Sequence, residues 1–337
     1  MRIQRTGTEI LAGDWPAHPD QTALLEARGA LVAWDVLADA GPAVRVDDPD
    51  RAAEWLWEVY GAEAAAGILG DATEVTVPED GDWQVRDACR VVAQLTWVEA
   101  WWPASSAAGV PAVSLELLHA ERAIATSVIE HLLDDDEATE RALATASLTG
   151  DATLDTRLVA LAEDYGVVPR EAAVPTREEF ALAAGGQDRA AGVTVLSGTV
   201  AVDWALVPAG VVDAAANAEW AVVRTGGSTY LEVAVALVAG ARQPLAARFG
   251  QVDVDLDRID DLGRLTGRAP VPATVLLMPP AQRVLTVYAP DFARPKESTE
   301  DDRARRDVIV EYARSRMEAA SATRTERTAG QLGDGTS

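Results

Sequence analysis

The second half of the chain is organised around residues 218–238, which read AEWAVVRTGGSTYLEVAVALV. Two runs rich in β-branched and aliphatic residues flank Gly226 and Gly227, and both glycines can adopt the positive φ that a two-residue hairpin turn requires. Similar runs, separated by Gly and Pro at intervals of roughly ten residues, continue from Gly192 to Phe292. The pattern predicts an antiparallel, Ig-like β-sandwich of about seven strands over residues 192–292.

Within this region, apolar and acidic side chains alternate along residues 252–257: Val252, Val254 and Leu256 against Asp253, Asp255 and Asp257. The alternation predicts a half-buried strand near an edge of the sheet. The aspartate spacing is also similar to that of a calcium loop, but Arg258 and Arg264 stand where an EF-hand needs Gly and Glu. An EF-hand is therefore excluded, and a looser calcium site at the sandwich edge is the alternative.

Residues 1–186 show mainly helical spacing, which predicts an acidic helical domain. The expected helices cover residues 20–39, a segment opened by Asp48-Pro49, and residues 82–102, 114–133, 138–148, 154–165 and 177–184. The helix over residues 20–39 is predicted from the helical spacing of its apolar residues, Leu24, Leu25, Leu31, Val32 and Val36. The last helix follows a capping box at Thr176 and ends at Gly185-Gly186, where we place the domain boundary.

A charged helix is expected over residues 299–320, with Val308, Ile309 and Tyr312 docking it onto the body of the protein. Residues 323–337 are polar and rich in Thr and Gly, and this composition predicts a disordered tail. The fold class that follows is α+β: a mostly helical N-terminal domain, an antiparallel sandwich and a C-terminal helix.

Cysteine and hydropathy limit the functional classes. The chain of 337 residues has one cysteine, Cys89, so it has no intramolecular disulfide framework. Its first residues lack the apolar core of a signal peptide, and no run reaches the roughly 20 apolar residues that span a bilayer. We expect a cytoplasmic protein without a membrane partner.

The negative charge is concentrated in the first part of the chain. The formal net charge is −25, and residues 1–191 contribute −22, from 35 acidic against 13 basic residues. Residues 192–292 carry 10 acids and 7 bases, net −3, and residues 293–337 balance. Such a surface argues against nucleic-acid binding, which draws its affinity from Lys and Arg. It favours either solubility alone or a partner protein with a basic surface.

The expected helix over residues 82–102 has two distinct faces. One carries a broad apolar stripe, and Trp97 and Trp101 lie on the other, beside Arg90 and Gln94. Two interpretations remain open: the helix is packed on both faces, or the tryptophans are a partner-binding site. Aromatic anchors next to polar residues are typical of protein interfaces.

Two other groups are candidates for chemistry. Glu116 and His119 have the i, i+3 spacing that lets a carboxylate and an imidazole reach one metal ion, but a di-iron site needs a second copy and further carboxylates. Cys89 falls near the apolar side of its helix, where a thiol is usually packed and inert. No nucleotide-binding, nucleophile-elbow or zinc-protease motif is present, so we expect no cofactor.

Two stretches carry a resemblance: WWPAS at residues 101–105 and DWALVPAGVVDAA at residues 203–215. With them the chain resembles an uncharacterised group of high-GC actinobacterial proteins with a helical front and a β-rich back. The resemblance implies no activity, although some such proteins resemble accessory components of conflict or defence loci. We therefore expect a non-catalytic adaptor or accessory subunit. The alternative is a hydrolase or metal-dependent enzyme that uses carboxylates in an interdomain cleft.

Overall fold

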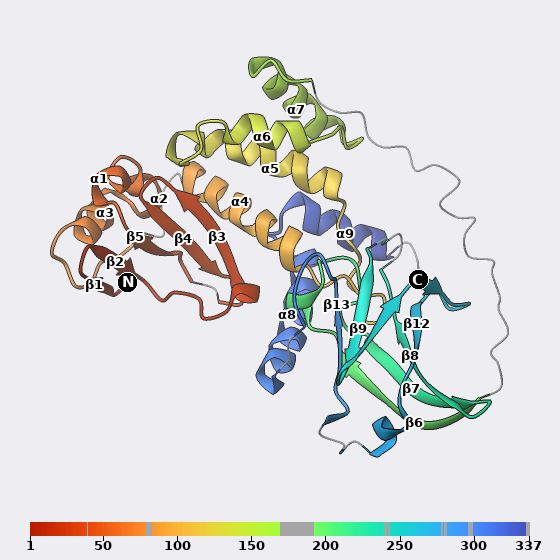
Figure 1. Ribbon diagram of the computed structural model, residues 1–337. Coiled ribbons are helices and arrows are strands. Elements are labelled where there is room, and N and C mark those ends of the chain that lie inside the picture. Colours follow the sequence, from red (N-terminus) through yellow and green to blue (C-terminus); the bar gives the residue numbers. More distant parts are fainter. Residues whose placement is uncertain are drawn as a thin grey trace. The chain divides into compact units, whose positions relative to one another are not determined.

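The computed structural model describes residues 1–38, 40–78, 83–168, 192–238, 241, 243–277, 279, 282–295 and 299–334. The chain divides into two compact units. Unit 1 holds the described parts of 1–101, 113–173 and 320–328, and unit 2 holds those of 102–112, 174–319 and 329–337. Helices and antiparallel sheets occur together, so the fold class is α+β (Figure 1). The predicted helix 177–184 and the boundary at 185–186 lie outside the described residues.

Unit 1 begins with an antiparallel five-stranded sheet, where the sequence predicts a helix over residues 20–39. The strand order is β1-β2-β5-β4-β3, with bounds β1 Ile3–Thr6, β2 Glu9–Ala12, β3 Thr22–Ala27, β4 Ala30–Asp35 and β5 Ala43–Val46. The helix prediction was wrong. Unit 1, for which the sequence predicts a mostly helical domain, therefore contains an antiparallel sheet as well as helices.

The reason lies in a second periodicity of the same residues. Ala23, Leu25 and Ala27 are buried while Leu24 and Glu26 are exposed, which is the two-residue repeat of a strand. In short apolar runs the spacing of a helix and that of a strand cannot be told apart. Leu24, Leu25 and Leu31 are therefore compatible with either structure. The turn between β3 and β4 contains a glycine at φ +71°, a conformation that disfavours any side chain.

The remaining helices of unit 1 largely follow the predicted ranges. Asp48, Ser114 and Asp151 cap three of them by accepting backbone N–H groups. The elements are α1 Pro49–Ala52, α2 Leu56–Tyr60, α3 Ala62–Leu69, α4 Gln84–Trp101, α5 Leu115–Ile129, α6 Ala138–Thr145 and α7 Ala152–Asp164, with short 3-10 turns at Pro19–Gln21 and Glu130–Leu132.

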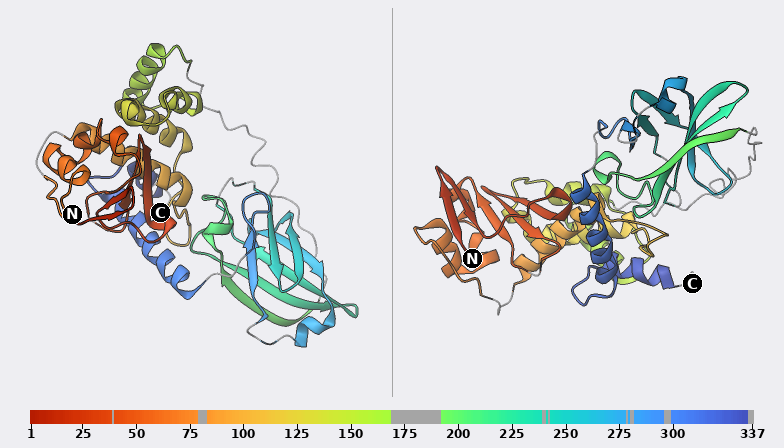
Figure 2. Two further views of the ribbon diagram at one scale, coloured as in Figure 1. Left: turned by 60° about the vertical axis from the view of Figure 1, so that its left-hand side comes forward. Right: turned by 90° about the horizontal axis from the view of Figure 1, so that it is seen from below.

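Unit 2 contains two antiparallel sheets, drawn green to blue in Figure 2. One has the order β11-β12-β8-β7-β6 and the other β10-β9-β13. Their bounds are β6 Val193–Ala201, β7 Asn217–Thr225, β8 Ser228–Val235, β9 Leu245–Phe249, β10 Val252–Leu256, β11 Arg258–Ile259, β12 Leu265–Pro270 and β13 Leu285–Tyr288, with 3-10 turns at Trp204–Leu206 and Ala273–Leu277. The predicted hairpin is confirmed, since Thr225 pairs with Ser228 and both intervening glycines have positive φ.

The two sheets of unit 2 share one apolar core, and the rings of Trp220 and Phe249 meet there with centroids 4.7 Å apart. The chain passes from one sheet to the other at Asp257, between β10 and β11. Gly267 lets β12 of one sheet lie close to β10 of the other. A Cβ at position 267 would lie 2.2 Å from the carbonyl oxygen of Asp255 on β10. The Ig-like topology stays a prediction.

Strand β10 has the predicted alternation. Val254 and Leu256 are buried, while Asp253 and Asp255 are exposed, and the strand lies at the edge of its sheet.

Helix α8, Glu300–Glu318, begins with a capping box between Thr299 and Asp302.

Only part of the predicted docking face of α8 is buried. Ile309 is fully enclosed, Tyr312 is partly buried and Val308 is 53% exposed. Neighbouring residues of a helix point about 100° apart, so Val308 and Ile309 cannot both face the core. The guanidinium of the buried Arg306 contributes instead, through an ion pair of 2.8 Å with Asp203.

A further helix, α9 Arg324–Asp334, occupies most of the tail for which the sequence predicts disorder. Its first turn belongs to unit 1. Composition was a poor guide to this segment because its order comes from partners that lie more than 200 positions earlier in the chain.

Candidate functional site

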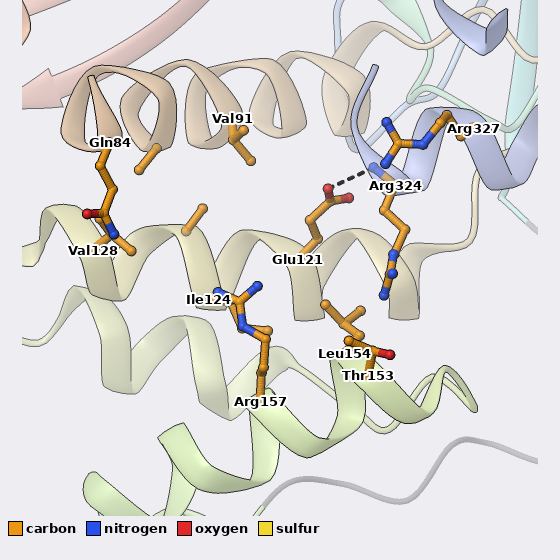
Figure 3. Close-up of a pocket in the computed structure, with 12 residues that line it drawn as sticks. Gln84, Val91, Glu121, Ile124, Val128, Thr153, Leu154, Arg157, Arg324 and Arg327 are labelled. Atoms are coloured by element: carbon orange, nitrogen blue, oxygen red, sulfur yellow. Dashed lines mark hydrogen bonds between the residues drawn. The ribbon is translucent and has the colours of Figure 1, made fainter. Parts of the chain in front are cut away.

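A groove of about 390 Å³ lies in unit 1 between α4, α5, α7 and the start of α9 (Figure 3). Its floor is apolar and is formed by Ala88, Val91, Ile124, Ala125, Val128 and Leu154. Its edge is polar and is formed by Gln84, Glu121, Thr153, Arg157, Arg324 and Arg327. We call this site the arginine-edged groove.

Helix periodicity explains the apolar floor. Ala88 and Val91 are three residues apart on α4, and Ile124 and Val128 are four apart on α5, so each pair lies on one face of its helix. The lining residues span about two turns of each helix, or roughly 10 Å. A volume near the lower end of small-molecule sites therefore suits a few apolar side chains or a short alkyl chain.

The arginines at the edge have unequal partners. Arg324 pairs with Asp151 at 2.8 Å, and Arg327 donates to the carbonyl oxygen of Ala322. Arg157 on α7 is exposed, and its side chain makes no hydrogen bond or ion pair with the described residues. Figure 3 shows Arg157 and Arg324 reaching toward the floor from different elements. Arg157 belongs to residues 1–191, which carry a net charge of −22, whereas Arg324 and Arg327 come from the charge-balanced C-terminal segment, so the groove brings three cationic side chains together beside an acidic part of the chain.

Glu121 fixes the segment that supplies two of these arginines. Its carboxylate accepts hydrogen bonds from the backbone N–H groups of Arg324 at 2.8 Å and Thr325 at 2.9 Å, and from the Thr325 hydroxyl at 2.9 Å. The first N–H groups of a helix have no partner within the helix, and a carboxylate there also stabilises the helix dipole. Helix α5 thus holds the start of α9 in place.

A capping box completes the attachment. The Thr323 N–H donates to Glu326 at 2.7 Å, and the Glu326 N–H donates back to the Thr323 hydroxyl at 3.2 Å. Glu326 is fully buried and also accepts from the side-chain amide of Gln94 on α4 at 2.9 Å. The spacing Thr323-x-x-Glu326 was a sequence signal for this helix start that the prediction of a disordered tail passed over.

The predicted partner-binding residues occupy different environments. Trp97 is 1% exposed, and its indole N–H donates to the carbonyl oxygen of Asp20 at 2.9 Å. Gln94 is also buried, whereas Arg90 is exposed and Trp101 is partly buried. The four residues share one side of α4, but they do not form one open surface. Partner binding there stays a prediction.

The predicted metal candidates Glu116 and His119 have separate partners. The imidazole of His119 lies 3.0 Å from Glu99, which also contacts Arg122, and Glu116 accepts from the Ser114 hydroxyl at 3.0 Å. The hydrogen bond from His119, assisted by Arg122, lowers the pKa of Glu99 from 4.5 to about 2.

The calcium candidates Asp253 and Asp255 of β10, and Asp257 directly after it, do not form a ligand cluster with other described residues. Asp253 pairs with Arg248 at 2.7 Å, and Asp255 and Asp257 are exposed. Within the described part of the chain, no three His, Cys, Asp or Glu side chains gather as a metal site would require.

Cys89 is buried, as the sequence predicts. The thiol is fully enclosed, and desolvation by burial, reinforced by the charge of Glu58, raises its pKa from 9.0 to about 12. Since the thiolate is the reactive form of cysteine, we expect this side chain to be unreactive in the folded protein.

Residues from the two stretches that carry the family resemblance meet inside unit 2. The Ser105 hydroxyl and the Ser106 N–H donate to the carboxylate of Asp213, and the Ala214 N–H donates to the Ala104 carbonyl oxygen. Asp213 also accepts two further backbone N–H groups from its own turn. These contacts join two loops, which is a structural role for both stretches.

Comparison with protein-family models, curated protein sequences and solved structures finds no match to this chain. The resemblance stays a prediction. No helix among the described residues has the length and apolarity needed to cross a bilayer.

Proposed function

We propose that the chain is a non-catalytic adaptor that binds a segment of a partner protein in the arginine-edged groove. The observation that carries the proposal is the combination of an apolar floor with arginines at the edge, in a groove whose other lining residues belong to the strongly acidic segment 1–191. Apolar contacts provide affinity at such sites, and charges at the edge provide specificity and a faster association.

The groove defines the chemistry of its occupant. The floor accepts two or three apolar side chains at helical spacing, and the guanidinium groups pair with carboxylates beside them. We therefore propose an acidic amphipathic segment. The sequence-based expectation of a partner with a basic surface rested on net charge alone. We propose that it holds only for the acidic surface outside the groove, and that the segment bound in the groove is acidic.

Nothing in the described residues specifically favours the enzymatic alternative. A carboxylate enzyme needs titratable groups that converge with shifted pKa values around a reacting atom. In the groove, the carboxylate of Glu121 is already engaged by three donors from α9. Its role there is to hold a helix start.

The test uses designed helical peptides with two leucines four residues apart, flanked either by Glu or by Lys, and titration calorimetry. We expect the Glu peptides to bind better than the Lys peptides. Arg157→Glu should weaken binding of the Glu peptides by about 3- to 10-fold and reduce the loss of affinity that added salt causes, because one attractive charge pair is removed. Arg90→Glu is the matched control, because Arg90 is also exposed but lies on another side of α4.

A second pair of variants tests the floor. Ala125→Phe places a ring in the groove without creating a cavity, so binding should be lost while the protein stays folded. Ala160→Phe makes the same change at an exposed position of α7 that does not line the groove. The proposal fails if Ala125→Phe leaves peptide affinity unchanged, or if Glu and Lys peptides bind equally well.

A further inference from the structure

Strand β6 forms one edge of the five-stranded sheet in unit 2 and pairs only with β7 among the described residues. It is nine residues long, and residues 192–202, GVTVLSGTVAV, contain no charged side chain. An edge strand carries a row of backbone N–H and C=O groups that can pair with another strand.

The other edge strands of the described sheets are short or charged. Strands β1 and β3 contain Arg5 and Glu26, β10 contains two aspartates, β11 has two residues and β13 has four. Short length and charge are the usual means by which proteins prevent sheets from joining at their edges. Strand β6 has neither protection, although 25% of the chain is charged.

The regular part of β6 is its C-terminal portion. A bulge between Thr194 and Leu196 interrupts the pairing with β7, and the register then runs without a break to Ala201. Leu196 and Val200 pack against the core, while Ser197 and Thr199 are exposed. Six residues therefore present an even, uncharged edge.

We propose that residues 196–200 of β6 pair antiparallel with the same strand of a second copy of this chain. A two-fold axis at Gly198 would place Leu196 beside Val200 of the other copy, which continues the apolar row on the core face. It would also place Ser197 beside Thr199, a hydroxyl pair on the solvent face. Both cross-strand pairs are favourable, and no like charges oppose each other.

The charge distribution supports a second copy as the occupant. Two chains of net charge −25 repel each other, and residues 192–292, which contain this edge, carry only −3. Association through β6 keeps the acidic residues of the N-terminal region out of the interface strand. Pairing of five residues per chain gives a small contact, so we expect a weak dimer that salt strengthens by screening the repulsion.

Sedimentation velocity over about 5 to 300 µM protein, in about 0.05 and 0.5 M salt, tests this inference independently of the groove. The wild-type protein should shift toward the dimer with concentration, more so at high salt. Ser197→Glu places two carboxylates near each other across the axis and should weaken association by at least about 10-fold. Ser228→Glu makes the same change at an exposed residue that is not on this edge and should behave as wild type.

Circular dichroism melting curves show that each variant remains folded. A monomer at every concentration and salt overturns the proposal, and so does a dimer that Ser197→Glu leaves intact. Equal loss of the dimer in Ser228→Glu also overturns it, because it would show that added charge rather than the β6 edge is responsible.

Discussion

Truncation of Glu121 to alanine should release the start of α9 and with it one edge of the groove. The carboxylate accepts three hydrogen bonds of 2.8, 2.9 and 2.9 Å from Arg324 and Thr325. A hydrogen bond to a charged group contributes about 1.5–3 kcal/mol, but Glu121 is partly exposed and the freed donors are hydrated when the segment opens. We therefore take about 1 kcal/mol for each bond, or about 3 kcal/mol in total.

A loss of this size corresponds to an opening equilibrium about 100-fold more favourable for residues 320–328. Native-state hydrogen exchange measures it at the Arg327 N–H, whose acceptor, the Thr323 carbonyl oxygen, is left unchanged by the substitution. Protection of this N–H should fall about 100-fold.

Glu116→Ala is the matched control, because Glu116 lies on the same helix and has one exposed hydrogen bond to Ser114. It should leave protection at Arg327 unchanged. Equal protection of Arg327 in wild type and Glu121→Ala would refute the view that Glu121 holds the segment, and the groove would then not depend on α5 for its arginines.

Three further outcomes are expected. Gly198→Ala should lower the free energy of unfolding by about 1–3 kcal/mol in denaturant titrations, because its Cβ would lie 2.7 Å from the ring of Trp220; an unchanged value would contradict the close packing. Cys89 should not react with a thiol reagent at pH 8 until the protein unfolds, and labelling of the folded protein at the rate of a free thiol would contradict its burial. The pKa of Glu99 is lowered from 4.5 to about 2, chiefly by His119, so its stabilising contribution is present above pH 4.5 and is lost as the pH falls toward 2; Glu99→Gln should flatten that part of the stability profile, and an identical acid limb would contradict the assignment.

Local patterns in the sequence were sufficient for several elements. The hairpin at Gly226-Gly227 follows from the positive φ that each glycine can adopt. The alternation of apolar and acidic residues in β10 follows from a strand with one buried and one solvent-exposed face. Helices α4 to α7 follow from apolar spacing and from capping residues such as Ser114. In each case, the information lies within a few residues of the element that it determines.

The tertiary structure decided the rest. Residues 22–35 fit both periodicities, and only pairing with β5 and packing against α4 made them strands. The burial of Trp97 and Gln94, the order of α9 and the arginine-edged groove depend on contacts between segments 77 to 232 positions apart. Burial and pairing of this kind are properties of the folded chain. The sequence therefore specified individual elements, and their contacts in space determined which side chains form a site.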